Sequence, residues 1–168
     1  MAATVTLNEH NSAVAGTRTD KTSGVVRCKA ADNAVADVNN PLQKPAPAGF
    51  TRSFEKWLKL RIGATGPSGN ITNVQFYTTG TPSTGADVYA RNTNPTVYAT
   101  PAVPANETGA TLASSYTGGS RKAMSTGTFT TPNTDIGDFL VLWMLLSDTV
   151  VAPGTTNSIN LFLSYDET

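Results

Sequence analysis

The strongest constraint on the fold is an uninterrupted run of eight apolar residues, FLVLWMLL, at positions 139–146. A helix needs about 20 apolar residues to span a bilayer, so this run is too short for that role. Its length and the preceding Gly137 favour a strand buried on both faces, although a short apolar run is also compatible with a buried helix. Such a strand needs cover from the chain itself or from another subunit. We expect the chain's own sheet and loops to cover it, with a subunit contact at the rim.

The composition indicates an all-β protein with many loops. Threonine, which favours strands, occurs 27 times, while the turn-forming residues glycine, asparagine and proline occur 14, 13 and 10 times. No segment has a convincing helical periodicity. We therefore predict one domain over residues 1–168, folded as an antiparallel, jelly-roll-like β-sandwich of seven to nine strands with long loops and little helix.

Alternation of apolar and polar residues predicts the principal strands. The clearest covers 54–62, with Phe54, Leu58, Leu60 and Ile62 on one face and Glu55, Trp57, Lys59 and Arg61 on the other. Other strands are expected at 3–7, 24–29, 71–77, 87–90, 126–130 and 158–165. We expect 139–146 and 158–165 to pair at the centre of one sheet, with 54–62 in the partner sheet.

Two long segments lack a strand pattern. Residues 30–49 are rich in alanine, asparagine and proline, so 1–49 is either a partly extended N-terminal arm or includes a rigid loop along the sandwich edge. Residues 92–127 are interrupted by glycine and proline, which predicts a long loop region with one or two edge strands. Loops of this length inside a domain are usually functional.

Charge is balanced over the whole chain but not along it. Residues 1–61 carry nine Lys/Arg against five Asp/Glu, and residues 62–168 carry three against seven, giving +4 and −4. We expect the two parts to neutralise each other within the fold; the alternative is head-to-tail contact between subunits. The chain lacks the basic excess of a nucleic-acid-binding protein, and we expect neither a nucleic-acid nor a membrane partner. The opening MAATVTL lacks the regions of a signal peptide, so we expect synthesis in the cytoplasm.

The sequence offers few residues for catalysis or metal binding. His10 is the only histidine and Cys28 the only cysteine, so neither a catalytic triad nor a zinc site is predicted. Asp135 and Asp138 flank Gly137 in a predicted turn, where a weak calcium site or a glycosidase pair is conceivable. Aspartates in loops more often form turns. We predict no enzyme activity, no catalytic residue, no metal ligand and no cofactor.

Aromatic and cationic side chains mark the expected interaction surface. Trp57 alternates with Lys59 and Arg61, and Tyr98 and Tyr116 lie in the long loop region. These five residues are our candidates for contact with a protein or a sugar. The alternative for Trp57 is packing beneath a loop.

Several segments resemble virion structural proteins of tailed bacteriophages. Those proteins have an SfxKwL strand followed by an I-x-N-hydrophobic-x-F-Y-x-x-G strand, to which SFEKWLKL at 53–60 and NITNVQFYTTG at 70–80 are similar. Shorter similarities extend over most of the chain, at 19–20, 31–32, 40–41, 98–102 and 163–167. Thr79 stands where an acidic residue is usual before the turn at Gly80, which weakens any metal site there. The resemblance implies a small all-β particle protein of the capsid decoration or cement type, and it brings no catalytic residue.

The resemblance leads to one main functional hypothesis. A decoration protein would bind the major capsid protein on the outside of the capsid, as a homotrimer or homodimer, and stabilise the shell. It would be made in the host cytoplasm and end in the virion. Two alternatives stay open: a tail or fibre module that binds a host carbohydrate or receptor through loops 78–127, and a low-activity glycan hydrolase using Asp135 or Asp138.

Overall fold

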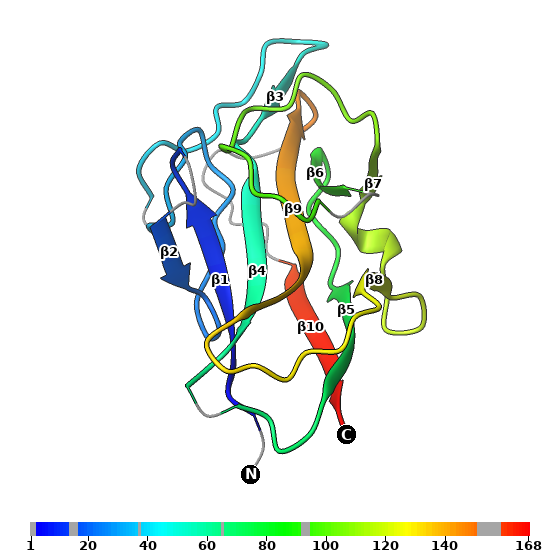
Figure 1. Ribbon diagram of the computed structural model, residues 1–168. Coiled ribbons are helices and arrows are strands. Elements are labelled where there is room, and N and C mark those ends of the chain that lie inside the picture. Colours follow the sequence, from blue (N-terminus) through cyan, green and yellow to red (C-terminus); the bar gives the residue numbers. More distant parts are fainter. Residues whose placement is uncertain (1–2, 14–16, 37, 65, 92–94, 151–158) are drawn as a thin grey trace.

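The alternating and apolar segments of the sequence form two packed β-sheets (Figure 1). The structure is a computed structural model that describes residues 3–13, 17–36, 38–64, 66–91, 95–150 and 159–168. Its strands are β1 (Val5–Asn11), β2 (Thr17–Asp20), β3 (Phe50–Arg52), β4 (Lys56–Ile62), β5 (Ile71–Thr79), β6 (Ala86–Arg91), β7 (Ala110–Leu112), β8 (Lys122–Ser125), β9 (Asp135–Ser147) and β10 (Asn160–Glu167), and a short 3-10 helix, η1, covers Ala113–Ser115. The predicted all-β sandwich is confirmed, with one strand more than the predicted range.

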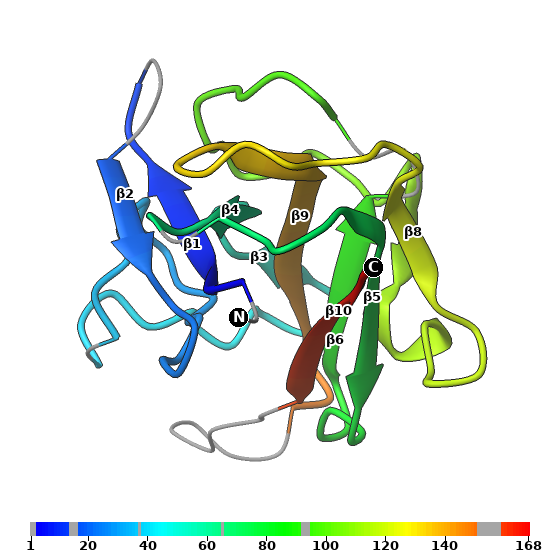
Figure 2. The same cartoon turned by 60° about the horizontal axis from the view of Figure 1, so that its bottom comes forward.

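The two sheets are unequal in size. The large sheet has the order β2-β1-β4-β9-β6-β7, with β3 paired to one end of β9, and the small sheet has the order β10-β5-β8. All of these pairings are antiparallel. Figure 2 shows β1, β4 and β9 on one side of the sandwich and the small sheet on the other. Strand β9 lies at the centre of the large sheet, as its apolar character on both faces requires.

One predicted strand pairing and one predicted sheet assignment are wrong. Strand β10 pairs with β5 in the small sheet and not with β9, and β4 lies beside β9 in the same sheet, with Leu58 opposite Leu140. The alternation in a strand shows which of its faces is buried, but it does not say in which of two layers the strand lies.

The main core lies between the sheets. From the large sheet it takes Leu58, Leu60 and Ile62 of β4, Val88 and Ala90 of β6, and Ile136, Leu140 and Leu142 of β9. From the small sheet it takes Ile71, Val74 and Phe76 of β5 and Met124 of β8. The predicted apolar face of 54–62 is therefore confirmed for three of its four residues; Phe54 lies outside β4 and is only half-buried.

The predicted turn at Asp135–Asp138 is instead a bulge inside β9. Gly137 has a φ of +70°, which glycine adopts without the strain that a side chain would cause. Across this bulge three residues of β4, from Leu58 to Leu60, lie opposite five residues of β9, from Leu140 to Ile136. Glycine beside aspartate is common both in turns and in β-bulges, so the sequence pattern alone does not distinguish the two.

The segments without strand patterns form loops and short edge strands. Within 1–49, β1 is inserted between β2 and β4, and the following loop is tied down where Lys29 O accepts a hydrogen bond from Phe54 N at 3.1 Å. Within 92–127, β7 and β8 lie at the edges of the two sheets, as predicted. Residues 1–2, 14–16, 37, 92–94 and 158, which belong to predicted features, lie outside the described residues.

Candidate functional site

Neighbouring residues of β1 and β4 point to opposite faces of the large sheet near the end marked by β3. His10 lies opposite Trp57 in the ladder between these strands, and Glu9 lies opposite Leu58. Glu9 and Lys56 therefore face the inside of the sandwich, while His10 and Trp57 face outward. A different loop covers each face.

The inner face carries a buried ionic network. Glu9 and Lys56 are both fully buried, and Lys56 Nζ lies 3.1 Å from Glu9 Oε1. Lys21 Nζ lies 3.8 Å from the other oxygen, Glu9 Oε2, and the Lys21 side chain is also buried. The geometry gives Glu9 two cationic neighbours, which offsets the cost of removing its charge from water.

The lysines also hold the loop that covers this network. Lys56 Nζ donates to Asn33 O at 2.8 Å, and Lys29 Nζ donates to Val35 O at 2.8 Å. Lys21 Nζ donates to Ala34 O. Three consecutive carbonyl groups thus each receive a buried ammonium donor, which fixes residues 33–35 over β1 and β4.

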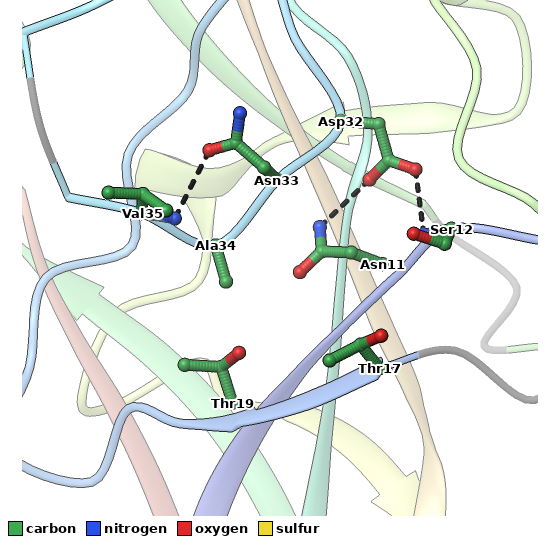
Figure 3. Close-up of a pocket in the computed structure, with 8 residues that line it drawn as sticks. All are labelled: Asn11, Ser12, Thr17, Thr19, Asp32, Asn33, Ala34 and Val35. Atoms are coloured by element: carbon green, nitrogen blue, oxygen red, sulfur yellow. Dashed lines mark hydrogen bonds between the residues drawn. The ribbon is translucent and has the colours of Figure 1, made fainter.

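A pocket of about 320 Å³ lies beside this network (Figure 3). One wall comes from the hairpin of β1 and β2 and the other from the loop at 32–35; the lining residues are Asn11, Ser12, Thr17, Thr19, Asp32, Asn33, Ala34 and Val35. Asp32 joins the walls, because its two oxygens accept from Asn11 Nδ2 and from Ser12 N, each at 2.8 Å.

The outer face carries an aromatic cluster. Trp57, Phe139 and Val141 are buried together, and Tyr98 packs against them. The ring of Trp57 lies 5.4 Å from that of Phe139 and 5.5 Å from that of Tyr98, both in edge-to-face arrangements. In Figure 1 the loop between β6 and β7 crosses over β9 and β4 at this place. The second face of the apolar run is thus covered by the chain's own loop, as predicted.

The prediction that Trp57 lies on an exposed surface is wrong. Trp57 is 2% exposed, and its Nε1 donates to Glu55 Oε2 at 2.9 Å. The predicted polar face of β4 exists, but the loop that carries Tyr98 covers it. The alternative reading, packing beneath a loop, is the observed one.

The other four predicted residues do not form one exposed surface with Trp57. Lys59 is half-buried, with Nζ 4.3 Å from the centre of the Phe139 ring, and burial lowers the pKa of its amine. Arg61 donates to Asp135 Oδ1 at 3.0 Å. Tyr116 packs 5.4 Å from Phe76 against the main core.

Tyr98 connects the outer cluster to the pocket. Its hydroxyl donates to Ser12 O at 2.6 Å, and Ser12 N donates to Asp32. Burial, followed by the nearby charge of Asp32, raises the pKa of Tyr98 to about 12. Ser12 has a φ of +69°, an uncommon conformation for serine, which the contacts on both its backbone groups help to hold.

The exposed apolar residues were not singled out from the sequence. Val38 is 78% exposed, Val97 76%, Phe50 60% and Val103 47%. They belong to the loop that ends at β3 and the loop between β6 and β7. Both loops are anchored on residues 52–55, where Phe54 N donates to Lys29 O, Glu55 N donates to Ala102 O and Arg52 pairs with Glu107. We call Val38, Phe50, Val97 and Val103 the apolar loop end.

The outer face of the small sheet carries a second exposed group. The rings of Tyr77 and Phe162 stack with centres 4.8 Å apart and planes 8° apart. The guanidinium carbon of Arg121 lies 4.8 Å from the centre of the Tyr77 ring. Arg121 is oriented by its Nε, which donates to Gly118 O at 3.0 Å.

Of the two carboxylates at the bulge, Asp135 is engaged in ion pairs. Asp135 Oδ2 lies 2.9 Å from Arg18 and Oδ1 lies 3.0 Å from Arg61. Burial raises the pKa of Asp138. In the described ranges no group of three or more His, Cys, Asp or Glu is arranged to hold a metal ion. The pairs of Arg18 and Arg61 with Asp135, and of Arg52 with Glu107, support neutralisation of the two halves of the chain within one protomer.

The described part of the chain has no helix with the length and apolarity needed to cross a membrane. No protein-family model matches the chain, and no curated protein or solved structure is significantly similar to it.

Proposed function

We propose that the chain is a structural protein of a tailed-bacteriophage virion that binds the outside of the capsid and stabilises it. The proposal rests on the resemblance of 53–60 and 70–80 to such proteins. These segments form most of β4 and β5, the strands that supply a large part of the core from the two sheets. The role needs a stable, adhesive domain and no catalytic group.

The apolar loop end is the observation that carries the proposed mode of binding. Its four apolar side chains are exposed on two segments of the chain that are both held by residues 52–55. A contiguous exposed apolar patch marks an interaction site on a soluble protein, and we propose that these four side chains form one such patch toward the shell. Covering them on the shell would remove apolar surface from water, at about 25 cal/mol for each Å².

A shell of repeated subunits adds avidity to such a contact. Each copy would bury roughly 1,600 Å² in total to form a stable interface. We propose that copies assemble as trimers or dimers on the major capsid protein, so that each bound copy raises the effective concentration of its neighbours' contacts. The stabilised shell would resist expansion because separating capsid subunits would also break these contacts.

Shell binding tests the proposal directly. Purified protein is added to capsids that lack it, and bound copies are counted after sedimentation. We expect saturation at a stoichiometry related to the symmetry of the shell. Phe50→Ser should weaken binding at least about tenfold, equivalent to 1.4 kcal/mol. Phe162→Ser, the same change on the small sheet, is the matched control and should bind like the wild type. Non-saturable binding, or no binding, contradicts the proposal.

A tail or fibre module that binds a host carbohydrate is the second candidate. The observation that favours it is the stacked Tyr77–Phe162 pair with Arg121, since an aromatic face can pack against the C–H groups of a sugar ring and a fixed guanidinium can donate hydrogen bonds to its hydroxyl groups. This candidate predicts few copies in each particle and loss of host attachment in Phe162→Ser. Quantitative mass spectrometry of purified particles separates the two candidates, because decoration requires hundreds of copies.

A further inference from the structure

The pocket beside β1 contains a buried acceptor whose orientation is determined by its neighbours. Asn11 is 4% exposed, and its Nδ2 donates to Asp32 Oδ1 at 2.8 Å and to Glu9 Oε1 at 3.3 Å. Ionised carboxylates only accept hydrogen bonds, so the amide must direct Nδ2 toward both of them. The other end, Oδ1, has no hydrogen-bond partner among the described residues and points into the pocket (Figure 3).

The walls around Asn11 add hydroxyl groups and small apolar groups. Thr17 lies opposite Asn11 in the ladder between β1 and β2, and Thr19 lies opposite Glu9, so both threonines are on the same face as Asn11. Ala34 and Val35 stand on the facing wall. The loop with Ala34 and Val35 is held by buried lysines, so this wall exists before any ligand binds.

The surrounding charges select against ionic ligands. Asp32 is the charged residue of the lining, and a cation would find both of its oxygens already engaged with Asn11 Nδ2 and Ser12 N. An anion would meet Asp32 and the acceptor oxygen of Asn11. A neutral molecule with hydroxyl groups fits both conditions, because it donates to Asn11 Oδ1 and exchanges hydrogen bonds with the threonine hydroxyls.

We propose that the pocket between the β1–β2 hairpin and residues 32–35 binds one neutral sugar residue. A hydroxyl of the sugar donates to Asn11 Oδ1, Thr19 provides a second polar contact, and Ala34 and Val35 contact carbon atoms of the ring. The volume of about 320 Å³ lies at the lower end of small-molecule sites, which suits a single ring and not an oligosaccharide. The pocket shares no residue with the apolar loop end, so the inference does not depend on the proposed capsid contact.

A titration by nuclear magnetic resonance tests this inference on the full chain. The ¹⁵N-labelled protein is titrated separately with glucose, galactose, mannose and N-acetylglucosamine, each to about 100 mM, because an affinity near 1 mM corresponds to only about 4 kcal/mol. We expect at least one sugar to cause saturable shifts of the Asn11 side-chain amide and the Thr19 backbone amide. The resonances of Tyr77 and Phe162 should not move.

Two variants and one control complete the test. Asn11→Ala and Thr19→Val should each weaken the sugar affinity at least about tenfold, while Thr79→Val, at the exposed end of β5, should leave it unchanged. Thr19→Val preserves side-chain shape, so it stays informative if Asn11→Ala does not fold. The inference is overturned if no sugar gives saturable shifts, if both variants bind like the wild type, or if a crystal soaked in sugar shows only a water molecule on Asn11 Oδ1.

Discussion

The two faces of the large sheet near β3 are closed by opposite kinds of chemistry. On the inner face, Glu9 and Lys56 form a buried ion pair, and lysines hold the covering loop by its carbonyl groups. On the outer face, one residue away along the same strands, His10 and Trp57 join an aromatic cluster beneath a second loop. Both faces belong to the same strands, β1 and β4, so the chemical difference comes from the side chains on each face and from the loop that packs over them.

The two faces should differ in how well they tolerate a single substitution. A buried ion pair contributes little net free energy compared with apolar residues of similar volume, but removing one member leaves an uncompensated charge. An aromatic cluster loses free energy in proportion to the volume removed. A single substitution in the ion pair on the inner face should therefore cause a large loss in the free energy of unfolding. Substitutions in the aromatic cluster on the outer face should cause losses that grow with the volume removed.

The largest effect is expected for Lys56→Ala. This change leaves Glu9 buried with only the more distant Lys21 as a cationic neighbour, and Asn33 O loses a donor. We expect the free energy of unfolding in urea to fall by about 3–5 kcal/mol, a large part of the total for a domain of this size.

A double variant tests whether the unpaired charge causes that loss. Glu9→Leu combined with Lys56→Met replaces the pair by apolar groups of similar size, and it should be more stable than Lys56→Ala alone. If the double variant is the less stable of the two, the ion pair itself stabilises the fold, and the contrast with the outer face is weaker than we argue.

Cys28 reports whether the inner closure excludes water. Cys28 is partly exposed as a residue, yet burial raises the pKa of its thiol from 9.0 to about 11, more than the nearby charge of Lys56 lowers it. Only the thiolate reacts, so alkylation by iodoacetamide at pH 8 should be about a hundredfold slower in the native protein than in urea. Equal rates in the two states would show that water enters this side freely.

Trp57→Phe should have a smaller effect, on the outer face. The change removes part of a buried ring and the hydrogen bond from Nε1 to Glu55, but Glu55 keeps its ion pair with Arg91. We expect a loss of about 2 kcal/mol in urea, with cooperative unfolding preserved. Trp143 stays as the fluorescent probe. A loss as large as that of Lys56→Ala would mean that the outer closure is no more tolerant than the inner one.

The sequence predicted the fold class and the core better than the layers and the site. Leu58, Leu60 and Ile62 were assigned to the core because alternation reports burial directly. The same alternation places Lys56 in phase with them, and Glu9 in phase with Val5 and Leu7, which was the available signal for a buried charge pair. Glu9 and Lys56 lie far apart in the chain, so their pairing could not be deduced from the spacing of residues within either strand.

The loop that packs over the outer face of β4 could not be predicted from the sequence pattern either. Trp57, Lys59 and Arg61 alternate as an exposed face would, and only the path of the loop through Pro95 and Tyr98 buries Trp57. The pocket has the same origin, because Asn11 and Asp32 meet through a loop with no periodic pattern. Loops without local propensity are placed by tertiary contacts, which a single sequence does not display.

The smallest effect is expected for Tyr98→Phe, which connects the two faces. At pH 7 the variant loses the hydrogen bond to Ser12 O, about 1 kcal/mol. The fold raises the pKa of Tyr98 from 10.0 to about 12, so between these values the unfolded chain releases the phenol proton more readily than the native protein does. The contribution of Tyr98 to stability is therefore complete below pH 10 and declines as the pH rises toward 12.

We expect the difference in unfolding free energy between wild type and variant to shrink across this range in urea titrations. A difference that stays constant from pH 9 to pH 11.5 would mean that the Tyr98 hydroxyl ionises as freely in the native protein as in the unfolded chain, and that the two closures are not coupled through it.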